Sequence, residues 1–279
     1  LEGSNGVGFH SVWAAAFFYF EIPDQNSSFS LHYQRLAFVN LTLIDCSTNL
    51  QIVYIIAREI RLSYQVLALK WRPRLFADAI GQEAITTTLK NSINGDKIGH
   101  AYLMTGTRGI GKTTVARIFA KALRCSNRTP EAEPCLVCDN CTGIDSGQSL
   151  DFIEIDGASN NSVDDIRDLI ENVQYLPTNG KYKVYLIDEI HMLSVNAFNA
   201  LLKTLEEPPK HVIFILATTD PQKLLGTVLS RCLRFDFRNA KEDDLVNHLN
   251  NIAKTEGINF ENQTIPKVLA KQGKGSFRD

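Results

Sequence analysis

The sequence has little net charge, no basic residues near its start and no long apolar run. Its 279 residues carry a formal net charge of -2, so any contact with nucleic acid has to come from a local patch or from partners. The first lysine or arginine is Arg35, so the charged region that begins a signal peptide is missing. The apolar residues 13–20 are too few to cross a bilayer. These absences predict a globular, soluble protein without membrane contact.

Residues 1–62 differ from the rest of the chain because they contain no chemical motif. Within them, residues 36–57 predict either a pair of strands or a helix. This stretch carries Asn40, Asp45, Asn49 and Gln51, and such polar residues argue against a membrane span. We interpret residues 1–62 as an extension outside the functional domain.

The most specific motif is a phosphate-binding loop of the pattern G-x-x-x-x-G-K-[ST]. It consists of Gly106, Thr107, Arg108, Gly109, Ile110, Gly111, Lys112, Thr113 and Thr114. Residues 101–105 predict a buried strand before the loop, and apolar residues at helical spacing predict a helix after it. Glycines let backbone N–H groups face a triphosphate, while Lys112 would reach its β- and γ-phosphates and Thr113 would hold Mg²⁺.

A second signal is the acidic pair Asp188-Glu189 at the end of the apolar run 183–187. Such a run predicts a buried parallel strand whose C-terminal edge delivers two carboxylates to a ligand site. Asp188 would support Mg²⁺, and Glu189 would orient the water that attacks the γ-phosphorus.

Another apolar run, residues 212–217, is followed by Thr218 and Thr219. A polar residue at that strand end can report the presence of the γ-phosphate. A helix N-cap or turn role is the alternative for either threonine. His191, just after the acidic pair, is interpreted as structural.

Four of the six cysteines lie close together, at Cys125, Cys135, Cys138 and Cys141. Four thiolates at this spacing can close a tetrahedral shell around Zn²⁺, so we predict a structural zinc site. An iron–sulfur cluster is an alternative, although the ferredoxin pattern places a proline after its fourth cysteine. Unliganded thiols are the third alternative. A disulfide framework is not expected, because a reducing cytoplasm suits a nucleotide-binding chain of this size.

Together these patterns predict a doubly wound α/β fold with a parallel sheet between helices. Residues 83–93 and 194–207 predict helices, residues 152–155 a strand, and Ser162 a capping-box helix start. Residues 64–82 either wrap the base and ribose of a nucleotide or form a surface loop with a packed Phe76.

The motif set resembles the AAA+ ATPases of the clamp-loader group. Besides the loop and the acidic pair, it includes Ser230-Arg231-Cys232, residues 201–209 and residues 275–279. With the cysteine run between loop and acidic strand, the chain is most similar to the gamma/tau family of bacterial DNA polymerase III subunits. The resemblance extends from about residue 63 to residue 279.

This resemblance implies further residue roles. Arg231 is similar to an arginine finger that acts in trans on a neighbouring subunit's ATP, and Arg278 to a lid arginine that contacts the γ-phosphate of its own. Thr219 takes the place of the residue that senses this phosphate. Arg72 and Pro73 lie in a segment similar to the one that flanks the adenine. Residue 63 falls where family members begin, so residues 1–62 are expected to be a mistranslated upstream region.

The resemblance also implies an organisation and a function. Residues 63–239 would form the AAA+ domain, with the zinc module at about 124–142, and residues 240–279 the start of a helical lid. ATP binding and hydrolysis would let a ring of clamp-loader subunits place a sliding clamp on primer-template DNA in the cytoplasm. A polymerase core would bind through a C-terminal region absent from this sequence. The alternatives are another AAA+ DNA motor of the branch-migration type and a structural ring subunit that does not hydrolyse ATP.

Overall fold

The structure, a computed structural model, describes residues 66–262 and 264–279. The extension 1–62, including the predicted strands or helix at 36–57, lies outside the described residues. The elements in chain order are α3 Leu67–Lys70, η1 Phe76–Asp78, α4 Glu83–Asn94, β1 Ala101–Thr105, α5 Lys112–Arg124, α6 Asp139–Ser146, β2 Phe152–Asp156, α7 Val163–Val173, β3 Lys183–Asp188, η2 Ile190–Met192, α8 Val195–Glu206, β4 Val212–Thr218, η3 Pro221–Lys223, α9 Gly226–Leu229, β5 Leu233–Asp236, α10 Glu242–Glu256 and α11 Thr264–Gln272.

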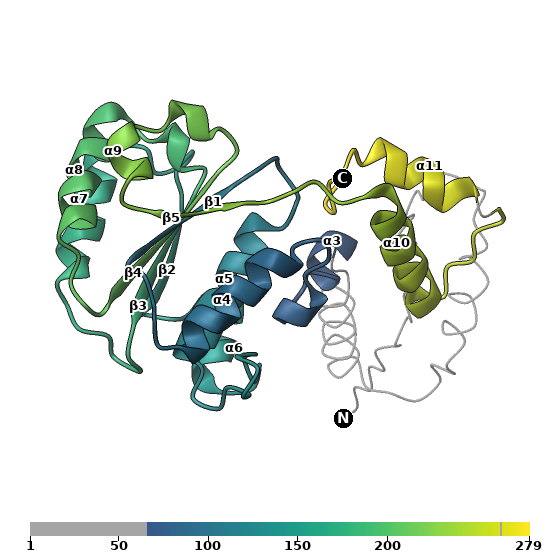
Figure 1. The fold of residues 1–279 in the computed structure, drawn as a ribbon, viewed down its shortest axis with the longest axis horizontal. Helices are drawn as coiled ribbons and strands as arrows, with labels where there is room; N and C mark the ends of the chain where they lie inside the picture. Colours follow the sequence, from purple (N-terminus) through teal and green to yellow (C-terminus); the bar gives the residue numbers. More distant parts are fainter. Residues whose placement is uncertain (1–65, 263) are drawn as a thin grey trace, which may run out of the picture. The chain divides into compact units, whose positions relative to one another are not determined.

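Five strands form one parallel sheet in the order β2-β3-β4-β1-β5. Because chain neighbours β1 and β2 are separated in the sheet, helical crossovers run over both of its faces (Figure 1). The predicted strands at 101–105, 152–155, 183–187 and 212–217 are all present. The doubly wound parallel α/β fold expected from the sequence is therefore confirmed.

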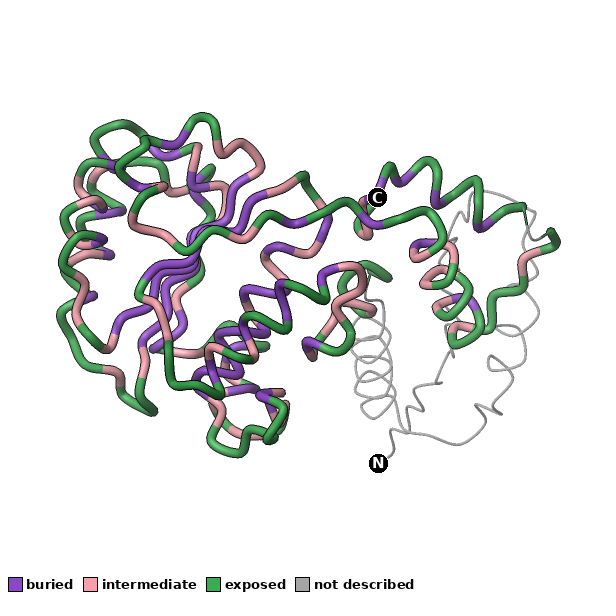
Figure 2. Tube along the Cα trace, in the orientation of Figure 1, coloured by how far each residue is buried: buried purple, intermediate pink, exposed green. Residues whose placement is uncertain are grey.

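The sheet separates two hydrophobic cores. Successive side chains of a strand point to opposite faces, so Tyr102 and Met104 of β1 pack with α4 and α5, whereas Leu103 packs with α7 and α8. β1 and β4 are buried along their whole length, as expected for parallel strands covered on both faces (Figure 2). A small third cluster packs Leu245 of α10 against Ala270 of α11 and includes Ala240, which precedes α10. The proposed division of the chain at residues 239 and 240 stays a prediction.

Local signals place the helix starts. The Ser162 hydroxyl accepts the Asp165 N–H at 3.2 Å, and the Asp165 carboxylate accepts the Ser162 N–H at 3.2 Å. This reciprocal pair is the capping box that the sequence predicted for α7.

Within the described ranges 66–262 and 264–279, no helix combines the length and apolar character that a membrane crossing needs.

A buried ion pair joins the end of α5 to the residue before β2. Arg124 and Asp151 lie 2.9 Å apart, with side chains 1% and 5% exposed. Asp151 also accepts the N–H groups of Thr178 and Asn179. Although burial raises the pKa of Asp151, these N–H groups and the Arg124 guanidinium outweigh burial and lower it.

We expect Asp151→Asn to lower the free energy of unfolding by about 3–5 kcal/mol, because it leaves the Arg124 charge buried without its partner. The wild-type advantage is present above about pH 4, the ordinary pKa of an aspartate, and is lost as pH falls through the lowered pKa. Urea unfolding at pH 7 and in acid measures both effects. The control is Asp96→Asn, which breaks the exposed pair between Asp96 and Lys181. Equal losses in the two variants would contradict the prediction.

Candidate functional site

The phosphate-binding loop joins β1 to α5 in a backbone conformation that glycine favours. Gly106, Gly109 and Gly111 have φ angles of 141°, 77° and 100°, in the left-handed region that other residues avoid. A Cβ on Gly106 would also lie 2.9 Å from the Phe237 carbonyl oxygen. Gly111 is the N-cap of α5, so the loop delivers the N-terminus of this helix to its ligand, as an anion site requires.

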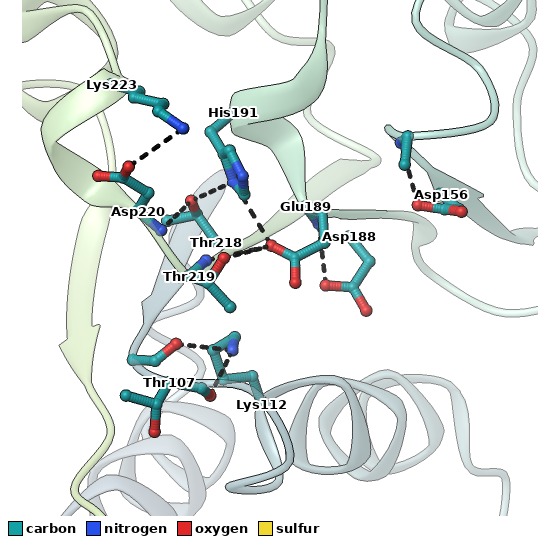
Figure 3. A network of polar contacts seen from close by, with 12 residues as sticks. Thr107, Lys112, Asp156, Asp188, Glu189, His191, Thr218, Thr219, Asp220 and Lys223 are labelled. Atoms are coloured by element: carbon teal, nitrogen blue, oxygen red, sulfur yellow. Dashed lines mark hydrogen bonds and ion pairs between the residues drawn. The ribbon is translucent and has the colours of Figure 1, made fainter.

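Lys112 is buried and points back over the loop. Its Nζ donates to the Gly106 carbonyl at 2.7 Å and to the Thr107 carbonyl at 2.8 Å (Figure 3). Burial lowers the pKa of Lys112, while the charges of Glu189 and Asp188 oppose that shift. The ammonium is therefore held over the loop and faces the acidic pair.

The loop and the acidic strand meet although β4 lies between β1 and β3 in the sheet. The Thr113 hydroxyl donates to Asp188 Oδ2 at 2.7 Å, and Asp188 Oδ1 accepts the Glu189 N–H at 2.9 Å. A hydroxyl beside a carboxylate is the kind of oxygen pair that suits Mg²⁺. The structure thus brings together the two residues that the sequence assigned to magnesium.

Glu189 and Thr219 form the centre of a polar network (Figure 3). Glu189 Oε2 accepts the Thr219 hydroxyl at 2.9 Å and the Thr219 N–H at 3.2 Å. Thr218 is fully buried, and its hydroxyl lies 2.9 Å from His191 Nδ1. Of the two threonines that the sequence left open, Thr219 is therefore the one whose side chain contacts the acidic pair.

His191 belongs to this network, which the sequence interpretation did not foresee. Its side chain is 9% exposed, and its Nδ1 lies 3.4 Å from Glu189 Oε2. The signal that the sequence offered was its place two residues after Glu189. It holds both Thr218 and Glu189, so its contacts join two strand ends.

The expected base-flanking segment lies beside the loop helix. Arg72 Nε donates to the Thr114 hydroxyl at 3.0 Å. Burial, with the nearby Arg117 charge, lowers the pKa of Arg72. Pro73 is partly buried next to it, and Phe76 packs into the core with 2% exposure. Arg117 itself pairs with Glu154 at 2.7 Å and was not singled out from the sequence.

The two arginines assigned by resemblance lie in different places. Arg278 follows Phe277, whose N–H donates to the Gly109 carbonyl at 3.0 Å, so the segment that carries Arg278 contacts the loop. Arg231 instead pairs with Glu206 at 2.8 Å and donates to the Thr227 carbonyl at 2.6 Å. It shares no described bond with the loop or the acidic pair.

The four cysteines converge. Cys125 caps the end of α5, Cys138 caps the start of α6 and Cys141 lies in the first turn of α6. The four Sγ atoms lie within 4.8 Å of one another. Burial opposes ionisation of Cys138, but bonds from the backbone N–H groups of Ser126 and Cys141 outweigh it and lower its pKa to about 6. Burial instead raises the pKa values of Cys125 and Cys141. A metal ligand needs the thiolate form, and in this cluster Cys138 is the thiol that ionises most readily.

Comparison with known proteins identifies the family. The family described as "DNA polymerase III, delta subunit" matches residues 81–241. The chain belongs to this family. Over 218 residues, or 78% of this chain, it is 55% identical to DNA polymerase III subunit tau/gamma of Haemophilus influenzae and 54% identical to subunit tau of Escherichia coli. These matches cover 31% and 34% of those proteins, so the chain spans about a third of their length. The expected resemblance to the gamma/tau subunits is confirmed.

A solved structure agrees with the fold of this family member. The Thermotoga maritima RuvB Holliday junction branch migration motor superposes with a TM-score of 0.54 at 21% identity, covering 75% of this chain and 62% of that one. At this identity the likeness concerns the fold alone. The AAA+ fold expected from the sequence is confirmed.

Two glycines of the loop give a prediction. We expect Gly106→Ala to lower stability more than Gly111→Ala. Both variants carry the strain of a left-handed alanine, about 1–2 kcal/mol, but only Gly106 has the Phe237 carbonyl in the way, since nothing lies within 4 Å of a Cβ on Gly111. Chemical unfolding of the two variants measures the difference. Equal midpoints would show that the contact with Phe237 carries no cost.

Proposed function

We propose that this chain is an ATP-hydrolysing subunit of a DNA polymerase III clamp loader. The observation that carries the proposal is the meeting of Thr113, Asp188 and Glu189 at one sheet edge, beside a phosphate-binding loop. The 54–55% identity to tau and tau/gamma subunits supports the polymerase III assignment. ATP would be bound and hydrolysed to place a sliding clamp on primed DNA during replication.

Each site residue has a role that follows from its position. Loop N–H groups of residues 106–114 and Lys112 would bind the phosphates, while Arg72 and Pro73 would flank the base. Thr113 and Asp188 would hold Mg²⁺, which neutralises charge that builds on the phosphates. Glu189 would orient the attacking water and accept its proton. Since Thr219 donates to Glu189, it would both align this carboxylate and sense the γ-phosphate.

The arginines extend the site beyond one subunit. Arg278 would reach the γ-phosphate from the segment that contacts Gly109. Arg231 would act on the ATP of a neighbouring subunit. This fits its described partners, Glu206 and Thr227, neither of which belongs to the phosphate-binding loop. An arginine supplied in trans raises turnover by about 10³–10⁵-fold in related NTPases. Hydrolysis would therefore depend on assembly of the ring.

The cysteine cluster would hold a structural zinc ion. Tetrahedral Zn²⁺ with sulfur at about 2.3 Å places its ligands about 3.8 Å apart, and Cys125 and Cys138 already lie 4.0 Å apart. An iron–sulfur cluster inserts several atoms between its ligands and so requires a wider spread. With all four positions filled by cysteine, the ion would stabilise the module and leave catalysis to the loop.

The partners follow from the proposed role. They are other clamp-loader subunits in a ring, the sliding clamp, primer-template DNA and, through further sequence, the polymerase core, all in the cytoplasm. A lid formed from residue 240 onward would link nucleotide binding to ring geometry. A branch-migration motor would share the nucleotide residues but would have no use for the cysteine module, and no described contact favours it.

We expect Glu189→Gln to keep ATP binding but lower turnover by about 10²–10⁴-fold, because the amide cannot accept a proton from water. The measurement is ATPase activity of the full-length protein assembled with its partner subunits, with and without clamp and primed DNA. Glu207→Gln, an exposed glutamate outside the network, is the matched control. Stimulation that needs DNA but no clamp would favour the branch-migration alternative, and unchanged turnover in Glu189→Gln would remove Glu189 from the mechanism.

Elemental analysis of protein purified without chelator should give one zinc ion per chain. Cys138→Ser should lose the ion, because it removes one of four ligands, while Cys232→Ser should keep it, since Cys232 is outside the cluster. Iron in place of zinc would support the cluster alternative. Finding no metal in the wild type would leave unliganded thiols.

A further inference from the structure

A turn in the cysteine module, residues 124–142, directs one carboxylate toward the segment 72–77. Within this turn, residues 129–133, the Thr129 N–H donates to the Glu133 carbonyl at 3.0 Å and the Ala132 N–H to the Thr129 carbonyl at 3.0 Å. The Glu133 N–H donates to the Thr129 hydroxyl at 3.2 Å. Ala132 is fully buried in a left-handed conformation with φ of 63°. These bonds fix the direction of the Glu133 side chain, only two residues before Cys135.

Glu133 binds the segment that follows Arg72 and Pro73. Its Oε2 accepts the Phe76 N–H at 2.8 Å and its Oε1 accepts the Ala77 N–H at 3.1 Å. Lys90 of α4 pairs with the same carboxylate at 2.6 Å. The N–H groups at the start of η1 have no earlier carbonyl to bond, so a carboxylate is the natural group to satisfy them.

The packing around Glu133 agrees with the hydrogen bonds. Ala132 and Phe76 belong to the same hydrophobic core, and Asn94 at the end of α4 donates to the Pro130 carbonyl at 3.0 Å. The module is therefore joined to both the segment 72–77 and α4. Phe76 and Glu133 are 57 positions apart in the sequence. A loop that only held a metal would not need such a long-range contact.

The same segment leads directly to the nucleotide site. Four residues before Phe76, Arg72 donates to the Thr114 hydroxyl in the first turn of α5. The first turn of α5 also contains Lys112 and Thr113. A displacement of residues 76–77 would therefore move Arg72 and Pro73 relative to the phosphate-binding loop.

We propose that Glu133 is a positioning residue through which the cysteine module holds the segment 72–77 against the nucleotide site. This inference rests on the proposed function, because it assigns the module a part in ATP binding. The module then contributes to nucleotide affinity without touching the nucleotide. Glu133 acts through the backbone of Phe76 and Ala77, and Arg72 carries the effect to Thr114.

The experiment compares variants of the full-length protein by titration with a fluorescent ATP analogue and Mg²⁺. Mutations along such contact chains change coupling by about 0.5–2 kcal/mol, so Glu133→Ala should weaken binding roughly 3- to 10-fold. Turnover at saturating ATP should stay near the wild-type value. Glu133→Gln keeps one acceptor oxygen, so its affinity for the analogue should lie between those of the wild type and Glu133→Ala. Glu131→Ala, an exposed glutamate in the same turn, is the control and should bind as the wild type does.

A second measurement starts from the wild type, so its main result does not depend on a variant folding. Local opening of the module is an equilibrium, and coupling between such equilibria and ligand binding is reciprocal. Saturating ATP should therefore lower the population of the open module and slow the reaction of its thiols with 5,5′-dithiobis(2-nitrobenzoic acid) in the wild type. The slowing should be smaller in Glu133→Gln.

The outcomes separate the inference from the proposed function. Wild-type affinity in Glu133→Ala, or thiol reactivity that ATP leaves unchanged, would overturn the coupling while the ATPase assignment stands. A turnover loss without an affinity loss would also contradict it. Failure of the wild-type protein to bind ATP would instead overturn the proposed function.

Discussion

The structure depends on the parallel alignment of β1, β3 and β4. Because all three strands run in the same direction, their C-terminal ends share one edge of the sheet. The phosphate-binding loop leaves β1 at this edge, the acidic pair leaves β3 and Thr219 follows β4. Because β4 lies between β1 and β3, Thr219 at the end of β4 lies between Lys112, which follows β1, and Glu189, which follows β3 (Figure 3). The polar network is a consequence of strand order.

Sequence patterns predicted most of this fold because the deciding interactions are local. A buried parallel strand is apolar at every position, and the phosphate-binding loop carries its own glycine geometry, so both can be recognised from a few residues. The contacts of Arg72 with Thr114 and of Glu133 with Phe76 join residues 42 and 57 positions apart. No periodicity encodes such pairs. For the same reason, the strand pattern alone left Thr218 and Thr219 equivalent. Only the resemblance to the family pointed to Thr219, and in the structure Thr219 bonds to Glu189 whereas Thr218 bonds to His191.

Glu189 combines backbone strain with tight side-chain restraint. Its φ of 45° is unusual for a residue other than glycine, and such strain persists only where surrounding contacts enforce it. Thr219 and His191 supply those contacts at the carboxylate, while Asp188 accepts the Glu189 N–H. The backbone of Gly157, the residue after β2, packs closely against that of Glu189, since a Cβ on Gly157 would lie 2.8 Å from the Glu189 carbonyl oxygen. Residues at the ends of β2, β3 and β4 therefore hold Glu189, and Thr219 and His191 are the ones that contact its carboxylate.

The four converging cysteines raise the question of why a group able to hold a metal lies beside the candidate nucleotide site. The apolar content of the cysteine module is small: within residues 124–142, Ala132 and Cys141 are buried hydrophobic residues, and Ile144 follows just after. A module of this size does not bury enough surface to stay folded unaided, which is where a structural metal contributes most. Once rigid, the turn at 129–133 can hold Glu133 at a fixed distance from α4 and η1. A flexible loop with the same carboxylate would lose more conformational entropy in making these bonds, so rigidity in the module is what gives the contact with Phe76 and Ala77 its strength.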